Sequence, residues 1–302
     1  MKAWNDLSDC NPDFVVDESS LDAGVYVVAT PLGNLGDLSY RAREILSRAS
    51  FLAAENIAVG RRWLEILGKE QAPNWKRPHL LSYRESSRES DARKILELLE
   101  TSESVALVSD AGTPGVSDPG WHLVDEVRQA GFPVWAIPGS CAAVAALSIS
   151  GFPSRRFSFE GFLPPSGRHR REALERLSEC ANPCILYESP HKFLKTLDDL
   201  AELFPERELF VSREMTKKFE ESWRGTLAEA RLVWPDKTVK GEFTLVLGPR
   251  TSESRLEDTE IPLESLEFMR ELRLPTKSAT AILKHFFPKA SKKAIYKELS
   301  QS

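Results

Sequence analysis

Residues 109–120 read SDAGTPGVSDPG, so glycines, prolines and aspartates are concentrated directly after an apolar run at residues 104–108. Glycine lets backbone amides approach a ligand closely and permits turns with positive φ. A carboxylate such as that of Asp110, at the end of a buried strand, is costly unless it finds donors, for example ligand hydroxyls or an ammonium group. This loop therefore predicts a binding site for a ligand with a ribose and an amino-acid end, without phosphate.

Two more loops of this character follow apolar runs, TPLGNLGDLSYRA at residues 30–42 and PGSCAAVAAL at residues 138–147. None of the three fits Gly-x-Gly-x-x-Gly or Gly-x-x-x-x-Gly-Lys-Ser/Thr, which disfavours a nicotinamide dinucleotide or a nucleoside triphosphate. The chain also lacks Gly-x-Ser-x-Gly, the motif of ordinary serine hydrolases. One such loop is often only a tight turn, but three at one edge of a sheet favour a binding site.

The elements that would position these loops alternate along the chain. Helix-like stretches with apolar residues three and four apart lie between apolar runs that predict strands. These predicted strands are residues 25–30, 51–55, 79–83, 105–110 and 134–138. The alternation indicates a parallel sheet covered on both faces, and the loops at the carboxyl ends of its strands meet at one edge.

A second unit follows the sequence ISGFPSRRF at residues 149–157, which breaks the alternation. Its predicted strands contain FSFEGFL, PCILYES, RELFVSREM and KGEFTLVLG, and its predicted helices are RREALERLSE and HKFLKTLDDLAELF. No long helix follows the third of these strands before the chain continues, and this predicts a mixed rather than a purely parallel sheet. After residue 250 the composition indicates three short helices; the last two have the rhythm of a helix-turn-helix, or of two helices that cap a domain.

Charge is unevenly distributed along the chain. The formal net charge is −5, and the first 22 residues alone hold six acids against Lys2. Residues 272–302 hold seven bases and one acid, Glu298. A basic, short-helical end can contact phosphates, although a solvated helical face would have the same composition.

The cysteines and the apolar stretches indicate the cellular compartment and argue against a disulfide-rich or membrane-spanning protein. The four cysteines, Cys10, Cys141, Cys180 and Cys184, show no disulfide framework, and we expect a cytoplasmic protein without a metal site. The longest stretch of low polarity, around residues 142–152, is too short to cross a membrane. The acidic head at residues 1–23 is expected to be a flexible extension.

The stretches VYVVATPLGNLGDLSYRA, SDAGTPGVSDPG, EGFLP, LYESPHKF and SREMTKKFEE together resemble the ribosomal RNA small subunit methyltransferase I family, a branch of the tetrapyrrole methylase superfamily. The resemblance covers residues 24–248, and the basic end looks like the C-terminal region of that family. It implies two α/β domains of the class III methyltransferase type, at residues 24–138 and 139–250, followed by a helical tail at 251–302. The basic charge of that tail makes it a candidate for RNA contact. The resemblance also implies a homodimer that binds S-adenosyl-L-methionine between the domains and methylates a cytidine ribose 2′-hydroxyl in 16S rRNA of the small ribosomal subunit.

Residues are carried over from the family only where the motifs match. The expected cofactor contacts are Pro31, Val108, Ser109, Asp110, Gly112, Thr113, Cys141, Ala142, Tyr187, Glu188 and Met215. Methyl transfer to oxygen requires that the donor and the acceptor are aligned and that the hydroxyl loses its proton. The polar residues near strand ends that could assist are Glu55, Glu85, Glu188, Glu214 and Lys217. Candidates for RNA contact are Arg168, Arg170, Arg171, Lys289, Lys292 and Lys293.

Two loops depart from the family. AENIA at residues 54–58 replaces the usual Ala-Glu-Asp-Thr-Arg, and YRESSRE at residues 83–89 replaces His-Glu-His-Asn-Glu. Ser140 also stands where proline is common. We therefore expect retained cofactor binding with an altered acceptor or rate. A methylase acting on a small molecule such as a tetrapyrrole, and a catalytically impaired RNA-binding relative, remain alternatives.

Overall fold

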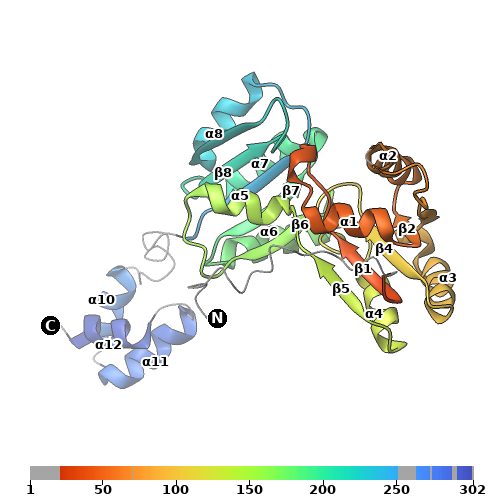
Figure 1. Ribbon diagram of the computed structural model, residues 1–302. Helices are drawn as coiled ribbons and strands as arrows, with labels where there is room; N and C mark the ends of the chain where they lie inside the picture. The colour runs from red at the N-terminus through yellow and green to blue at the C-terminus, as the bar shows by residue number, and fades with distance from the viewer. Residues whose placement is uncertain (1–20, 70, 251–262, 273, 288–290, 301–302) are drawn as a thin grey trace, which may run out of the picture.

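The computed structural model describes residues 21–69, 71–250, 263–272, 274–287 and 291–300, and its first sheet has five parallel strands (Figure 1). The strands are β1 (Gly24–Val28), β2 (Phe51–Ala54), β3 (His79–Ser82), β4 (Ser104–Val108) and β5 (Val134–Ile137). They lie in the order β3-β2-β4-β1-β5 and every neighbouring pair is parallel. The predicted parallel sheet is confirmed.

Helices cover both faces of this sheet, as the two-sided apolar strands require. One face packs against α1 (Tyr40–Arg48) and α2 (Ile57–Gly68), and the other against α3 (Arg88–Glu100) and α4 (Trp121–Gln129). The short helices η2 (Leu35–Asp37) and η3 (Glu85–Ser87) lie in the loops after β1 and β3.

The strand order places the three glycine-containing loops side by side, because β4, β1 and β5 are neighbours. The backbones of Thr30 and Gly112 exchange two hydrogen bonds, of 2.8 and 3.0 Å, between the loops after β1 and β4. The hydroxyl of Thr113 donates to the carbonyl of Ser140, in the loop after β5, over 2.9 Å. These bonds join all three loops at one edge of the sheet.

The second sheet is mixed, also as predicted. Its strands are β6 (Ser158–Phe162), β7 (Cys184–Glu188), β8 (Glu208–Arg213), β9 (Glu221–Thr226) and β10 (Phe243–Leu247). The order is β6-β7-β10-β8-β9; only β6 and β7 run parallel, and the other pairs are antiparallel. The helices α6 (Gly167–Glu179), α7 (Pro190–Leu203) and α8 (Leu227–Val233), with η4 (Trp234–Asp236), share a core on one face.

The other face of the second sheet is covered by α5 (Ala142–Ser150), a helix where the sequence predicted a loop. Its sequence AAVAALSIS is apolar almost throughout, so it lacks the amphipathic spacing that identifies a surface helix. Gly151 ends it with a φ of 73°, the left-handed conformation typical of a helix C-terminus. Packing of α5 on the second sheet supports a domain boundary near residue 138, which remains a proposal.

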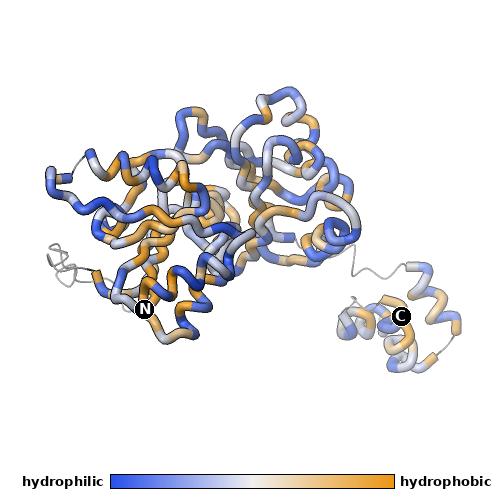
Figure 2. The backbone as a smooth tube through the Cα atoms, turned by 90° about the vertical axis from the view of Figure 1, so that its right-hand side faces the viewer, coloured by the Kyte–Doolittle hydropathy of each residue, from blue (hydrophilic) through white to orange (hydrophobic). Residues whose placement is uncertain are grey.

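The C-terminal helices α10 (Leu263–Glu271), α11 (Thr276–Phe286) and α12 (Lys292–Ser300) form a small core of their own. They lie apart from the two sheets in both views (Figures 1 and 2). Three short helices were predicted here. Within the described residues, none of the helices is long and apolar enough to span a membrane. The expected acidic extension lies almost entirely outside the described residues.

Candidate active site

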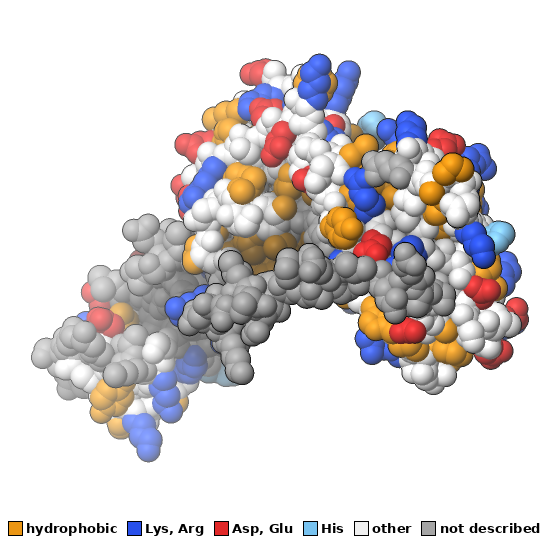
Figure 3. All heavy atoms as spheres, viewed as in Figure 1, with side chains coloured by type: hydrophobic (Ala, Val, Ile, Leu, Met, Phe, Trp, Pro, Cys, Tyr) orange, Lys and Arg blue, Asp and Glu red, His pale blue; other side chains and the backbone are white. Residues whose placement is uncertain are grey.

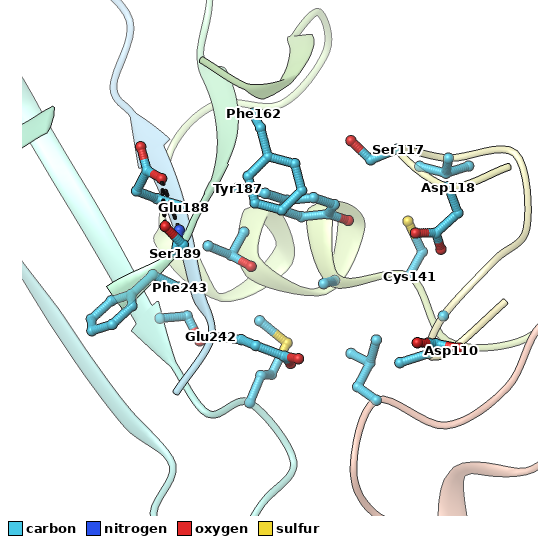
Figure 4. A pocket seen from close by; sticks show the side chains of 18 of the residues that line it. Asp110, Ser117, Asp118, Cys141, Phe162, Tyr187, Glu188, Ser189, Glu242 and Phe243 are labelled. Atoms are coloured by element: carbon cyan, nitrogen blue, oxygen red, sulfur yellow. Dashed lines mark hydrogen bonds between the residues drawn. The ribbon is translucent and has the colours of Figure 1, made fainter. Parts of the chain in front are cut away.

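A cavity of about 300 Å³ lies between the carboxyl edge of the first sheet and the second sheet (Figure 4). One wall is formed by Leu32 and the loop at residues 110–118 of the first unit, with Cys141 and Ala142 at the start of α5. The opposite wall comes from the ends of β6, β7 and β8 and from the start of β10. The residues of that wall are Phe162, Tyr187, Glu188, Ser189, Pro190, Ser212, Met215, Glu242, Phe243 and Thr244.

Two glycines bring the walls together. A side chain at Gly161 of β6 would place its Cβ 2.7 Å from Oγ of Ser117 on the opposite wall. A Cβ at Gly33, after β1, would lie 2.3 Å from the side chain of Lys217. Both distances are shorter than real Cβ contacts, so the spacing of the walls depends on these glycines.

Left-handed backbone turns place side chains at the cavity. Ser117 has a φ of 64°, directly before Asp118, and Met215 lies between Glu214 with a φ of 54° and Thr216 with a φ of 64°. Such conformations cost about 1–3 kcal/mol in residues other than glycine and concentrate at functional sites.

The aromatic part of the second wall is fixed by contacts around Tyr187. Its Oη accepts a hydrogen bond from the backbone N–H of Ala143 over 3.0 Å, and its ring meets those of Phe159 and Phe162 edge-on. Burial, chiefly, raises the pKa of Tyr187 to about 12, with Cys141 adding to the effect. The phenol therefore stays neutral and serves to hold the first turn of α5.

Ser212 is a buried polar group that a ligand would satisfy. It is 1% exposed and lines the cavity, yet its Oγ has no hydrogen-bond partner among the described residues. Buried polar atoms are nearly always paired, so an unpaired hydroxyl at a cavity wall indicates a missing partner.

The electrostatics of the cavity favour a cation. Its lining contains the carboxylates of Asp110, Asp118 and Glu242, whereas that of Glu188 is bound away from the cavity. No Lys, Arg or His stands among the residues that line the cavity in the described structure. Desolvation is the largest cause that raises the pKa of Asp118, and the neighbouring carboxylates of Asp110 and Glu242 raise it further. A cationic ligand would relieve this repulsion, whereas phosphates would increase it.

Most of the expected cofactor contacts meet at this cavity. Pro31, Val108 and Ser109 do not line it; they are buried in the strand ends behind the wall. The expected contacts that do line it are Asp110, Gly112, Thr113, Cys141, Ala142, Tyr187, Glu188 and Met215.

The structure does not bring the five catalytic candidates to the cavity as free groups. Glu188 is 3% exposed, and its carboxylate accepts hydrogen bonds from Ser189 N at 2.8 Å and Thr196 Oγ1 at 2.7 Å, away from the cavity. Lys217 donates to Glu214 at 2.9 Å and to Glu242 at 3.0 Å.

The remaining two candidates, Glu55 and Glu85, lie within the altered loops. Glu85 pairs with Arg88 over 2.7 Å at the surface. Glu55 does not line the cavity, but its pKa is raised by desolvation, and then by the charges of Asp110, Asp118 and Glu85. The AENIA and YRESSRE loops are therefore close to the acidic wall, as an acceptor side would be. Asn56 also caps α2 by accepting from the N–H of Ala58.

Sequence reasoning missed several residues of the site. Asp118 lies in the same loop as Asp110, but only Asp110 closely follows the apolar run that predicts a strand. Ser212 and Thr244 lie on the antiparallel strands β8 and β10, whose register no local pattern reveals, and Glu242 directly precedes β10.

One expected RNA contact needs correction. Arg170 is 4% exposed, and its guanidinium donates to Asp199 at 2.7 Å, Pro164 O at 2.9 Å and Thr196 Oγ1 at 2.9 Å. It is therefore a buried structural group and is not accessible to RNA. Arg168 and Arg171 are exposed on the same helix.

The basic C-terminal candidates are only partly described. Lys292 is exposed on α12, and Lys293 lies in the same helix, while Lys289 lies outside the described residues. As for a metal, no three His, Cys, Asp or Glu side chains converge on a possible ion site within the described ranges. The expectation of no metal stays a prediction.

Comparison with known proteins identifies the family. The model of the Tetrapyrrole (Corrin/Porphyrin) Methylases matches residues 24–231. A ribosomal RNA small subunit methyltransferase I from Synechocystis is 43% identical over 76% of this chain and 81% of its own length. Another from Neisseria meningitidis is 38% identical over 92% of this chain and 94% of its own.

Solved structures agree on the fold. A uroporphyrin-III C-methyl transferase from Thermus thermophilus, complexed with S-adenyl homocysteine, superposes with a TM-score of 0.52 at 18% identity, over 74% of this chain and 96% of that one. A diphthine synthase gives 0.57 at 13% identity, over 74% and 89%. The chain belongs to the tetrapyrrole methylase family and, within it, to the ribosomal RNA small subunit methyltransferase I group.

Proposed function

We propose that this protein is an S-adenosyl-L-methionine-dependent methyltransferase that acts on the RNA of the small ribosomal subunit and methylates a ribose 2′-hydroxyl of a cytidine. The observation that carries the proposal is an acidic cavity, with no cationic lining among the described residues, in a chain 43% identical to a ribosomal RNA small subunit methyltransferase I. The finer assignment to one cytidine hydroxyl rests on the family resemblance.

The residues of the cavity fit the cofactor. When bound, S-adenosylmethionine supplies the methyl group, a sulfonium leaving group and an ammonium group. Asp110 and Asp118 would then lie near a positive charge, and the Ser212 hydroxyl would gain a partner. Leu32 and Met215 offer apolar surface for a purine.

Two surface features support RNA as the acceptor. Trp121 is 57% exposed beside the altered YRESSRE loop, with the guanidinium of Arg88 5.7 Å from its ring centre. Aromatic rings paired with arginine are typical platforms for unstacked bases. Lys and Arg side chains also gather on the C-terminal helices (Figure 3); Lys292 is one exposed member.

The decisive experiment offers labelled S-adenosylmethionine with small ribosomal subunits, naked RNA or a porphyrin precursor. We expect label in ribosomal RNA, at one position that resists alkaline cleavage. Label in the porphyrin precursor would favour a small-molecule methylase, and label in none of the three would favour an impaired RNA-binding relative. Titration calorimetry tests the cofactor separately: an absence of heat at millimolar cofactor would contradict the proposed site.

The basic C-terminal helix yields a prediction of its own. Replacing Lys289, Lys292 and Lys293 together by Glu should weaken RNA binding and flatten its dependence on salt, because each phosphate contact contributes roughly −0.9 to the logarithmic salt slope. Binding of S-adenosylhomocysteine should not change, since the cavity lies between the two sheets. If the variant binds RNA with the same affinity as the wild type at every salt concentration, this helix has a purely structural role.

We also propose that the protein forms a homodimer and works in the cytoplasm, where ribosomes are. In support of the dimer, α5 packs one face on the second sheet while Val144 and Ile149 are each 54% exposed on it. Exposed apolar side chains on an otherwise packed helix are typical of an interface. Mass measurement in solution, with Val144→Lys as the dimer-breaking variant, tests this.

A further inference from the structure

We propose that Asp118 is the proton acceptor of the methyl transfer, taking the proton of the acceptor hydroxyl. This inference rests on the proposed function and assigns a role that the sequence left open. Its basis is the position of Asp118 in the loop after β4, where its side chain points into the cavity beside Cys141 and Ser117 (Figure 4).

Elimination among the carboxylates of the cavity favours this residue. Glu188 is turned into the protein by Ser189 and Thr196. Glu242 is paired with Lys217 over 3.0 Å and its side chain is 77% exposed, so solvent and an ammonium group weaken it as a base. Of the remaining two, Asp110 is the more exposed.

The adjacent helix α4 does not use Asp118 as a cap. Asp118 lies directly before Pro119 and Gly120, at the start of α4, yet this helix has no side-chain cap hydrogen bond in the described structure. The preceding residue, Ser117, has a left-handed φ of 64° and lies against Gly161 across the cleft. A strained residue that aims the next side chain into a cavity is typical of a functional site.

The groups that face Asp118 tune it as a base. The carboxylates of Asp110 and Glu242 repel its charge, and the neutral Tyr187 phenol lies near it. Desolvation, then these carboxylates, raise its pKa above the ordinary value, while Ser109 lowers it. A carboxylate with a raised pKa accepts protons more strongly at neutral pH.

The step conserves atoms and charge. The new bond forms between the hydroxyl oxygen and the methyl carbon as the carbon–sulfur bond breaks, and that electron pair stays on sulfur. The hydroxyl proton moves to a carboxylate oxygen of Asp118 and later to water. The sulfonium loses its positive charge and the Asp118 carboxylate loses its negative charge in the same step. The net charge of the cavity therefore stays the same.

The test compares Asp118→Asn with wild type in single-turnover transfer of labelled methyl to small ribosomal subunits between pH 5 and 9. The matched control is Asp125→Asn, the same change at an exposed residue of α4 that pairs with Gln129. We expect Asp118→Asn to lose about 100-fold or more in rate, while its affinity for S-adenosylhomocysteine by calorimetry stays within threefold of wild type. Asp125→Asn should match wild type in both.

The pH profile separates a proton acceptor from a structural residue. Wild-type rate should fall as the pH falls and Asp118 becomes protonated, and the variant should lose this limb and rise with hydroxide instead. A rate within threefold of wild type, an unchanged acid limb, or an equal loss of S-adenosylhomocysteine affinity would each overturn the proposal. A wild-type protein that binds S-adenosylhomocysteine but labels no RNA would overturn the proposed function, and this inference with it.

Discussion

Arg170→Met is expected to lower the free energy of unfolding by about 3 kcal/mol, because it removes one partner from a buried ionic network. The guanidinium of Arg170 joins the Asp199 carboxylate, the Pro164 carbonyl and the Thr196 hydroxyl. Thr196 in turn donates to Glu188, whose carboxylate holds the N–H of Ser189 at the start of α7. Chemical denaturation followed by fluorescence measures the change.

The adjacent Arg171 provides the matched control, since it is exposed on the same helix. Arg171→Met should change the free energy of unfolding by less than about 0.5 kcal/mol. If Arg171 contacts a phosphate, this variant should also lower the salt slope of RNA binding by about one unit, and Arg170→Met should not. Equal stability of the two variants would contradict the buried network.

The second large effect is expected from Gly161→Val. A side chain here meets Ser117 across the cleft and must adopt a φ of 61°, which a β-branched residue avoids. Overpacking costs about 1–3 kcal/mol, so separating the walls should weaken S-adenosylhomocysteine binding by about tenfold or more. Titration calorimetry on the purified variant gives the affinity directly.

Gly167 separates the steric effect from the backbone effect. Its φ of 75° is also left-handed, but an added Cβ would meet no atom within 4 Å. Gly167→Val should therefore lose similar stability through its backbone while binding S-adenosylhomocysteine like wild type. If both variants lose affinity to the same degree, the narrow approach of Gly161 to Ser117 does not control the cavity.

Much of the fold could be predicted because its signals are local. Apolar runs at regular spacing predicted the strands of the first sheet. Because β4, β1 and β5 are neighbours, the three glycine-containing loops that follow them lie side by side. Helix α5 was missed because AAVAALSIS is apolar on both faces, so it has no amphipathic period. Strand β9 was missed because ESWRGT pairs only at a sheet edge, through antiparallel contacts with β8.

In the candidate site, the positions of the loops could be predicted from the sequence, but the directions of the side chains could not. The acidic and glycine-containing loops could be predicted from spacing, since backbone approach and carboxylate placement depend on adjacent residues. The methyl donor was implied by the resemblance of these loops to a known family. Arg170 and Arg171 are neighbours in a basic run, yet only the packing of α6 against α7 decides that one is buried and the other is exposed.

The sequence alone determined the parallel and mixed sheets and the edge at which a ligand binds, because these follow from periodicity and from glycine-rich turns. It also determined the family, through the resemblance of its motifs to those of known methyltransferases. The tertiary structure alone decided which carboxylates face the cavity. Glu188 is turned away by Thr196, whereas the left-handed Ser117 points Asp118 inward. The physical reason is that side-chain direction depends on partners far apart in the chain, and folding brings those partners together.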